Sequence, residues 1–296
     1  MHKKLIHQLA QQISASLSKP IEIKSFESMG GGCINQAAIL HCTNEDYFIK
    51  YNQASLLDMF EAEATGLDEI AASATIRVPK PIGTGVSGQF SFLVLEALSF
   101  NSRAGSMTLL AEQLAAMHRV QQPRFGWQRA NFIGSTPQSN QWTDDWVSLW
   151  QQQRLGYQLN LLEASASDRG LLQSGYKLME ELGTFFTDYQ PLPSLLHGDL
   201  WSGNYSFAVG GVPVIYDPAV YYGDREADIA MTELFGGFSP DFYSAYQACY
   251  PLDAGYSVRK TLYNLYHILN HVNLFGGAYV SQARQMIDSL LSELRG

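Results

Sequence analysis

The hydrophobic periodicity of the chain changes near residue 99, and this change limits the possible folds more than any other feature. Short strand-like runs separated by turns occupy residues 21–98, and longer segments with helical periodicity follow them to the end of the chain. The sequence therefore predicts an α+β fold in two parts. We expect a small lobe with an antiparallel sheet at residues 1–98 and a larger, mainly helical lobe at residues 99–296.

The apolar pattern also predicts the individual elements. Gly83, Gly85 and Gly88 predict a turn. The first three predicted strands are antiparallel neighbours, and the strands lie at 21–28, 36–42, 46–51 and 90–98. Helices are predicted at 3–17, 54–73, 106–119, 143–163, 171–189, 225–235, 239–248, 257–274 and 278–295. The helical part is interrupted at 195–217, where a polar loop leads into a short apolar strand.

Composition and charge exclude several classes of protein. With 46% apolar and 16% charged residues, the chain is expected to fold rather than to remain disordered. Its 28 acidic and 19 basic residues give a formal charge of −9, which disfavours a broad interface with nucleic acid or an anionic membrane. Three scattered cysteines and the lack of an apolar stretch of about 20 residues predict a cytoplasmic protein without a disulfide framework or a membrane segment.

The strongest local signal is the segment His197–Asn204, with the sequence HGDLWSGN, which Asp217 follows at the end of an apolar strand. Phosphoryl transfer from a magnesium nucleotide needs a carboxylate that accepts the proton of a hydroxyl group, and hard oxygen ligands for the metal. We assign the first role to Asp199 and the second to Asn204 and Asp217. In the alternative, Asp199 and Asn204 only form turns in a polar loop, which is common for either residue alone.

Lys50 ends the third predicted strand, which is the position from which a kinase lysine reaches the α- and β-phosphates. Glu63 falls within the apolar stripe of helix 54–73, where a carboxylate without a counter-ion would be costly. We therefore expect Glu63 to pair with Lys50, and Glu61 is the second choice. In the alternative, Lys50 is an exposed lysine at the end of a strand.

A glycine-rich segment lies between the first two strands and is a candidate phosphate-binding loop. Its glycines leave room for backbone N–H groups to approach phosphate oxygens. The segment does not match GxGxxG or GxxxxGK[ST], so a plain hairpin turn is an equal alternative. Its residues are Gly30, Gly31, Gly32, Cys33, Ile34 and Asn35.

Taken together, the motifs resemble the fructosamine kinase (ketosamine-3-kinase) family, relatives of the aminoglycoside phosphotransferases within the protein-kinase-like fold. The resemblance spans nearly the whole chain and includes LFGG at 234–237 and again at 274–277. The segments that carry it are GGGCIN at 30–35, FEAEA at 60–64, HGDLWSGN at 197–204, YDPA at 216–219 and YGDREADIAM at 222–231.

The resemblance implies ATP-dependent phosphorylation of the sugar 3-hydroxyl of ketoamines, which are fructosamines or ribulosamines on amines and lysine side chains. The phosphorylated adduct is then unstable and releases the sugar. Asp228 would anchor the catalytic loop from the helix beneath it. The alternatives are an aminoglycoside, choline or homoserine kinase of the same superfamily, or a regulatory pseudokinase that binds nucleotide without turnover.

The same kinase-like arrangement suggests where adenine and the acceptor bind. Main-chain groups of Glu96, Ala97 and Leu98, at the end of strand 90–98, are expected to meet adenine.

For the acceptor, Trp201 follows the proposed base by two residues, and Asp224 and Glu226 are candidates for binding an ammonium or a sugar hydroxyl. Both carboxylates could instead lie on solvated faces. The segment 125–146 combines aromatic rings and amides, which suits one wall of a sugar pocket. Its rings could equally anchor the loop to the helical core.

Overall fold

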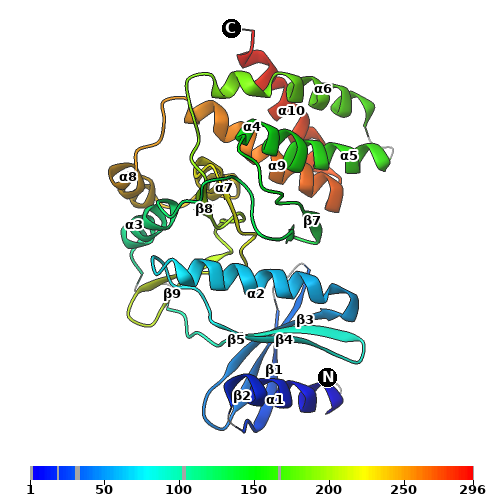
Figure 1. Cartoon of the computed structure of the whole chain (residues 1–296), viewed down its shortest axis with the longest axis vertical. Helices are drawn as coiled ribbons and strands as arrows, with labels where there is room; N and C mark the ends of the chain where they lie inside the picture. The colour runs from blue at the N-terminus through cyan, green and yellow to red at the C-terminus, as the bar shows by residue number, and fades with distance from the viewer. Residues whose placement is uncertain (1–2, 19, 31–33, 102–104, 166–167, 296) are drawn as a thin grey trace. The chain divides into compact units, whose positions relative to one another are not determined.

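The computed structural model describes residues 3–18, 20–30, 34–101, 105–165 and 168–295 (Figure 1). The chain divides into two compact units. The first unit contains residues 1–106 and 205–218, and the second contains 107–204 and 219–296. Residues 205–218 were expected in the C-terminal lobe, so this division differs from the predicted boundary.

Backbone pairing explains why residues 205–218 belong to the first unit. The hairpin of β9 (Tyr205–Ala208) and β10 (Val212–Ile215) bonds to Arg77, which precedes β4 (Pro81–Ser87) in the sequence, and to Asn101, which follows β5 (Phe90–Glu96). The Ile215 N–H donates to the Arg77 carbonyl at 3.1 Å, and the Asn101 N–H donates to the Phe207 carbonyl at 2.7 Å. Hydrophobic periodicity does not predict hydrogen bonds between segments so far apart in the sequence.

The first unit is built on a five-stranded antiparallel sheet with the order β1-β2-β3-β5-β4. The antiparallel pairing of the first three strands is confirmed. The expected turn at Gly83 and Gly85 is wrong, because both residues lie within a strand, and Gly85 leaves room for the Phe92 ring of the neighbouring strand. The strands are β1 (Ile23–Met29), β2 (Gln36–Cys42), β3 (Tyr47–Gln53), β4 (Pro81–Ser87) and β5 (Phe90–Glu96).

Two helices lie on opposite sides of this sheet (Figure 1). α1 (Lys3–Leu17) buries Leu9 and Ile13 against apolar side chains of one sheet face, including Ile49 of β3. α2 (Leu57–Ala72), preceded by a 3₁₀ turn at Ala54–Leu56, packs against β4 and β5. Because side chains alternate along a strand, Lys50 points to the face opposite Ile49, where α2 lies.

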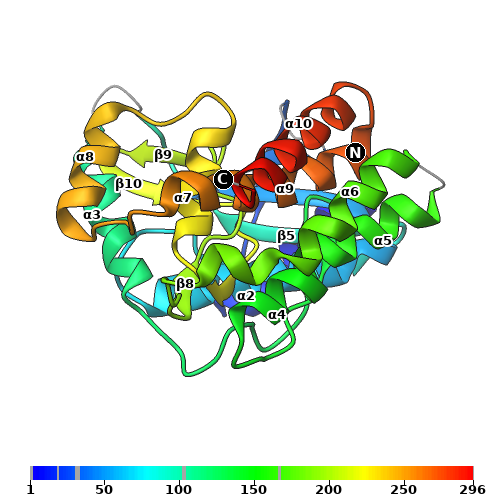
Figure 2. The ribbon, with the colours of Figure 1, turned by 90° about the horizontal axis from the view of Figure 1, so that it is seen from above.

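The second unit is mainly helical. Figure 2 shows α5, α6, α9 and α10 packed side by side, and α9 is the most deeply buried of them. The helices are α3 (Met107–His118), α4 (Trp146–Leu149), α5 (Gly156–Ala164), α6 (Arg169–Glu180), α7 (Glu226–Leu234), α8 (Pro240–Cys249), α9 (Tyr256–Phe275) and α10 (Ala278–Glu293).

Some segments of the second unit depart from the predicted pattern. The predicted helix 143–163 contains a π-helical stretch, Trp150–Leu155, between α4 and α5. Helix 171–189 ends at Glu180 and continues as a 3₁₀ turn, Leu182–Phe186. Two short strand pairs were not expected, because three residues show no measurable alternation: β6 (Asn131–Ile133) with β7 (Thr136–Gln138), and β8 (Ser194–Leu196) with β11 (Tyr221–Gly223). Within the described ranges, every helix is too short or too polar to cross a bilayer.

Candidate active site

The loop that carries Asp199 begins with a turn that only glycine fits. Gly198 has φ of +82°, and a Cβ atom there would lie 2.1 Å from the Ala219 carbonyl oxygen. The Ala219 N–H donates to the His197 carbonyl at 2.8 Å, which continues the pairing of β8 with β11. The turn therefore places Asp199 directly beyond the end of β8.

Asp228, on α7, holds this turn from below. Its buried carboxylate accepts hydrogen bonds from the backbone N–H of His197 at 2.7 Å and of Gly198 at 2.8 Å. His118 Nε2 lies 3.1 Å from the same carboxylate. Burial opposes ionisation of Asp228, but the bonds from His118 and the backbone amides hold its pKa below the ordinary value. Asp228 therefore stays charged and fixes the turn that precedes Asp199.

The structure brings Asp199 and Asn204 together within the second unit. The Asn204 side-chain amide donates to the Asp199 carbonyl at 2.8 Å and approaches the Asp199 carboxylate at 3.4 Å. The Asn204 N–H also donates to the Trp201 carbonyl at 2.9 Å, so the loop folds back on itself. Asp199 remains half-buried at this loop, whereas Asn204 is buried.

Trp201 projects from the same loop and is 36% exposed. A Cβ atom on Gly203 would lie 2.3 Å from the Trp201 ring, so the glycine lets the ring lie over its own loop. The Trp201 ring also contacts Phe235 in an edge-to-face arrangement, with 6.1 Å between the ring centroids. Trp201 is therefore both accessible and held in place.

Lys50, Glu63 and Asp217 form an ion cluster in the first unit. Lys50 Nζ lies 2.6 Å from Glu63 Oε1 and also contacts Asp217 Oδ1. The pairing of Lys50 with Glu63 is confirmed, and Glu61, the second choice, is not the partner that the structure shows. Asp217 follows β10 and reaches Lys50 from a segment 167 residues away in sequence.

Two carboxyl groups share the one positive charge of Lys50. Burial alone would lower the pKa of Lys50, but Asp217 and Glu63 raise it above the ordinary value, so Lys50 is a cation. Burial raises the pKa of Glu63 despite its contact with Lys50. Asp217 is partly exposed and adopts a φ of +60°, which is rare for a residue other than glycine. Observed backbone strain of this kind clusters at functional sites.

Each unit carries an oxygen ligand of the kind that was assigned to magnesium, Asp217 in the first and Asn204 in the second. The described residues contain no group of three or more His, Cys, Asp or Glu side chains that could hold a metal ion. Magnesium is usually bound through one or two protein oxygen ligands together with substrate phosphates and water, so it does not need such a group. The partly exposed Asp217 carboxylate and the Asn204 amide oxygen are each ligands of the kind that magnesium prefers.

The candidate phosphate loop is described only in part, since Gly31, Gly32 and Cys33 lie outside the described residues. Asn52 of β3 holds its second half. The Asn52 side-chain amide donates to the Ile34 carbonyl at 2.9 Å and to Asn35 Oδ1 at 2.8 Å. A Cβ atom on Gly30 would have no neighbour within 4 Å, so that position faces open space.

At the end of β5, the Glu96 side chain has partners in its own unit. Its carboxylate accepts from Arg77 Nη2 at 2.6 Å and from the Lys80 N–H at 3.3 Å. The Glu96 N–H donates to the Lys80 carbonyl. Ala97 and Leu98, which follow, are half-buried.

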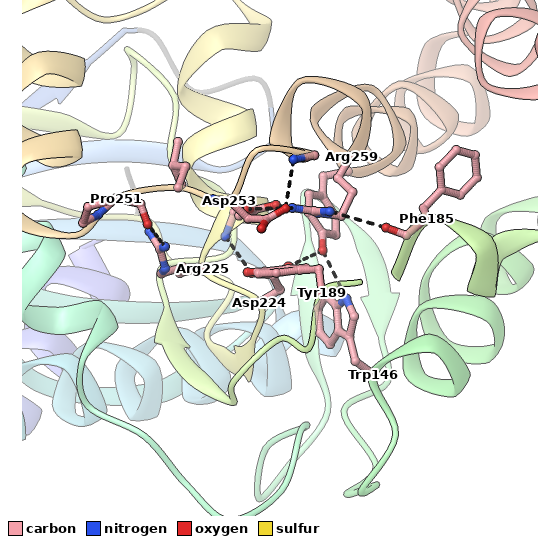
Figure 3. A network of polar contacts seen from close by, with 12 residues as sticks. Trp146, Phe185, Tyr189, Asp224, Arg225, Pro251, Asp253 and Arg259 are labelled. Atoms are coloured by element: carbon pink, nitrogen blue, oxygen red, sulfur yellow. Dashed lines mark hydrogen bonds and ion pairs between the residues drawn. The ribbon is translucent and has the colours of Figure 1, made fainter. Parts of the chain in front are cut away.

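Asp224 and Glu226 were expected at the substrate, and the structure places both inside the second unit instead. Asp224 is 1% exposed and accepts from the Tyr189 and Tyr263 hydroxyls (Figure 3). Glu226 is fully buried and pairs with Arg259 at 2.8 Å. Burial raises the pKa of both carboxyl groups, that of Glu226 to about 7. The burial of both carboxyl groups therefore argues against their contact with the sugar.

The aromatic segment 125–146 likewise packs mostly inward. Phe125, Trp127 and Trp146 are buried, and Trp146 donates to the Tyr263 hydroxyl at 3.2 Å. Trp142 is the exposed tryptophan of this segment. The packing of these rings favours their role as anchors of the loop.

Two supporting residues were missed at the level of sequence. His118 contacts Asp228, and the Tyr246 hydroxyl lies 2.7 Å from His118 Nδ1. Their partners are 110 and 128 residues away in sequence, and no local pattern indicates contacts over such separations.

Comparison with known proteins points to one family. The model of the fructosamine kinase family matches residues 5–293. A Synechocystis protein named "Probable ketoamine kinase" is 49% identical, and the match covers 96% of each chain. A chloroplastic protein-ribulosamine 3-kinase of Arabidopsis thaliana is 41% identical over 94% of this chain and 86% of that protein.

Solved structures agree with this result. A crystal structure of a fructosamine-3-kinase candidate from Haemophilus somnus has a TM-score of 0.87 and 31% identity, and the match covers 96% of each chain. The aminoglycoside phosphotransferase APH(4)-Ia, in a complex with ADP and hygromycin B, has a TM-score of 0.67 at 15% identity, covering 98% of this chain and 99% of that chain. At that identity the likeness shows the fold alone, which is the predicted kinase-like α+β fold.

Proposed function

Because this chain belongs to the fructosamine kinase family, we propose that it transfers the γ-phosphoryl group of ATP to the sugar 3-hydroxyl of ketoamines, namely fructosamines or ribulosamines on amines and lysine side chains. The observation that carries the proposal is the family match over residues 5–293, together with 49% identity to a ketoamine kinase homologue and 41% to a ribulosamine 3-kinase. The chain is thus a phosphotransferase with an alcohol group as acceptor. Phosphorylation would promote loss of the sugar from the amine.

In this proposal Asp199 is the catalytic residue. Its half-buried carboxylate accepts the proton of the sugar hydroxyl as the oxygen attacks the γ-phosphorus atom. Asp228 and the Gly198 turn support this role because they hold the backbone on which Asp199 stands. Trp201, accessible and two residues further, offers a ring face for the C–H groups of the sugar.

Binding of the nucleotide is proposed for residues of the first unit. Lys50, held by Glu63, donates to the α- and β-phosphates, and the backbone of residues 30–35 approaches the phosphate oxygens. Main-chain groups of residues 96–98 meet adenine, and the Glu96 carboxylate, which Arg77 and the Lys80 N–H hold, takes no part in this contact.

Asn204 and Asp217 would hold Mg²⁺, and this part of the proposal is supported by the chemistry of their oxygens and by the partial exposure of the Asp217 carboxylate. When bound, magnesium neutralises charge on the phosphate oxygens during transfer. We also place the enzyme in the cytoplasm, since Cys42 and Cys249 are free thiols, as a reducing compartment allows.

The direct test is a screen of ADP release with magnesium and ATP. Fructosyl-lysine, ribulosyl-lysine, kanamycin, choline and homoserine are compared at equal concentration. The proposal predicts that one or both glycated lysines give the highest rate. A higher rate with any of the other three acceptors would contradict the substrate class, and ADP release from none of them would contradict the kinase activity itself.

A further inference from the structure

Five aromatic rings of the second unit form a continuous strip that begins beside the proposed base. Trp201 contacts Phe235, with 6.1 Å between ring centroids, and Phe235 contacts His271 at 5.2 Å. His271 in turn contacts Phe275 at 5.5 Å and Tyr279 at 4.9 Å. We call these five residues the aromatic strip. It leads from the loop of Asp199 to the corner between α9 and α10.

The two LFGG segments build the middle and the far end of the aromatic strip. Phe235, of the first LFGG segment, lies just beyond the end of α7, and Phe275, of the second, lies at the end of α9. Both rings contact His271. The two glycines after each phenylalanine have positive φ, which lets the chain turn at once without strain. These glycines are Gly236 at +93°, Gly237 at +73°, Gly276 at +63° and Gly277 at +62°.

Phe275 and Tyr279, at the far end of the strip, are exposed at least in part, and the proposed phosphoryl transfer does not use them. Phe275 is 57% exposed, and Tyr279, Phe235 and His271 are half-buried. A single exposed apolar side chain is ordinary. A run of contacting rings that continues from an accessible tryptophan of the catalytic loop is different, because contiguous exposed apolar surface marks sites of interaction.

We propose that the aromatic strip binds the peptide around a glycated lysine, and that Phe275 and Tyr279 select an apolar, preferably aromatic, residue beside that lysine. The inference rests on the proposed function and deepens it. With the sugar hydroxyl at Asp199, the rest of the substrate extends over the loop surface, where Trp201 starts the strip.

The chemistry of a ketoamine suits this path. Its nitrogen is a secondary ammonium, which aromatic rings attract, and the methylene stem of lysine packs on ring faces. The strip continues for three ring-to-ring steps beyond Trp201, further than a free sugar adduct needs. An extended peptide advances about 3.3–3.6 Å per residue, so a few residues next to the lysine reach Phe275.

The test compares two acetylated pentapeptides, Gly-Phe-Lys-Phe-Gly and Gly-Ser-Lys-Ser-Gly, each with a ribulosyl group on lysine. ADP release should give a KM about five-fold lower for the peptide with phenylalanines, as expected for an added aromatic pair. Phe275→Ala should remove this preference while leaving the KM for free ribulosyl-lysine unchanged. Leu192→Ala is the matched control, because Leu192 is an exposed apolar residue of the second unit away from the strip.

The possible failures are distinguishable. Equal KM values for the two peptides in the unaltered enzyme, or a preference that persists in Phe275→Ala, would overturn the strip as a peptide site. The proposed kinase function would stand in both cases, since ADP would still be released. If no ketoamine, free or peptide-bound, supports ADP release, the proposed function itself fails and this inference fails with it.

Discussion

Lys50 shows how much of a candidate site can depend on one side chain. Its ammonium group is the single cation that the structure places against both Glu63 and Asp217 in the described part of the first unit. It connects α2 to the segment that follows β10, and its charge partly offsets the rise in the pKa of Glu63 that burial causes. A side chain with these partners serves stability and nucleotide binding together.

Replacement of Lys50 by methionine should therefore affect both properties. Removing one partner of a buried ion pair costs about 3–5 kcal/mol, because the other charge is left without compensation. We expect a lower thermal unfolding midpoint. We also expect an ATP KM at least about ten-fold higher, because the proposed contact of Lys50 with the phosphates is lost. Lys80→Met, at an exposed lysine of the same unit, is the control. An unchanged ATP KM in Lys50→Met would remove Lys50 from the nucleotide site.

Asp217 offers a test of the proposed metal site that leaves the Lys50–Glu63 pair in place. Asp217→Asn keeps the shape of the side chain but removes the charge that would attract Mg²⁺. We expect the Mg²⁺ concentration for half-maximal ADP release to rise about ten-fold or more, and a chelator to stop the reaction in both proteins. Identical magnesium titrations of the two proteins would count against Asp217 as a ligand.

At the scale of elements, the turn between β8 and Asp199 depends on one glycine. Gly198→Ala would introduce both a strained φ and a clash of the new Cβ with the Ala219 carbonyl. The backbone must then move away from Asp228, so we expect kcat to fall about 100-fold or more while the ATP KM changes little.

Gly210→Ala is the matched control for this turn. Gly210 has a similar φ of +88°, but a Cβ atom there has open space around it. Gly210→Ala therefore introduces the strained φ without the clash, and the kcat of this variant should stay within about two-fold of that of the unaltered enzyme. Equal kcat values in Gly198→Ala and Gly210→Ala would show that the position of the turn is not what limits catalysis.

The elements also show what could be predicted from the sequence and what could not. The pairing of Lys50 with Glu63 could be predicted, because a strand end and a carboxylate in an apolar helical stripe are local signals. The burial of Asp224 could not, because its partners Tyr189 and Tyr263 are 35 and 39 residues away and appear only after folding. For the same reason the strand Pro81–Ser87 was missed: its glycines signal a turn, and only the ring of Phe92 explains them.

At the scale of the whole molecule, the chain passes between the two units three times, near residues 106, 204 and 218. The second unit buries two ionisable groups, His267 and Glu226, whose effects on the pH dependence of stability have opposite signs. Burial lowers the pKa of His267 to about 3, so its contribution is present above its ordinary value of 6.5 and is lost as pH falls. Burial raises the pKa of Glu226 to about 7, so its contribution is lost as pH rises from 4.5 toward 7.

The histidine part of this balance can be isolated with His267→Gln. Between pH 7 and pH 5 His267 becomes protonated in the unfolded chain but stays neutral in the folded chain. This difference lowers the free energy of unfolding by about 2 kcal/mol. We expect the free energy of unfolding to fall by about that much more in the unaltered protein than in His267→Gln over this range, as measured by denaturant titration at both pH values. Parallel losses in the two proteins would mean that His267 is not buried in its neutral form.

The central claim is that Asp199 accepts the proton of a ketoamine hydroxyl during phosphoryl transfer from ATP, and Asp199→Asn tests it most directly. ADP release with ribulosyl-lysine is measured beside ATP binding, with Asp144→Asn, at an exposed carboxylate of the same unit, as the control. The account predicts a fall in turnover of about 100- to 10,000-fold in Asp199→Asn with ATP affinity retained. Turnover at the rate of the unaltered enzyme would contradict it.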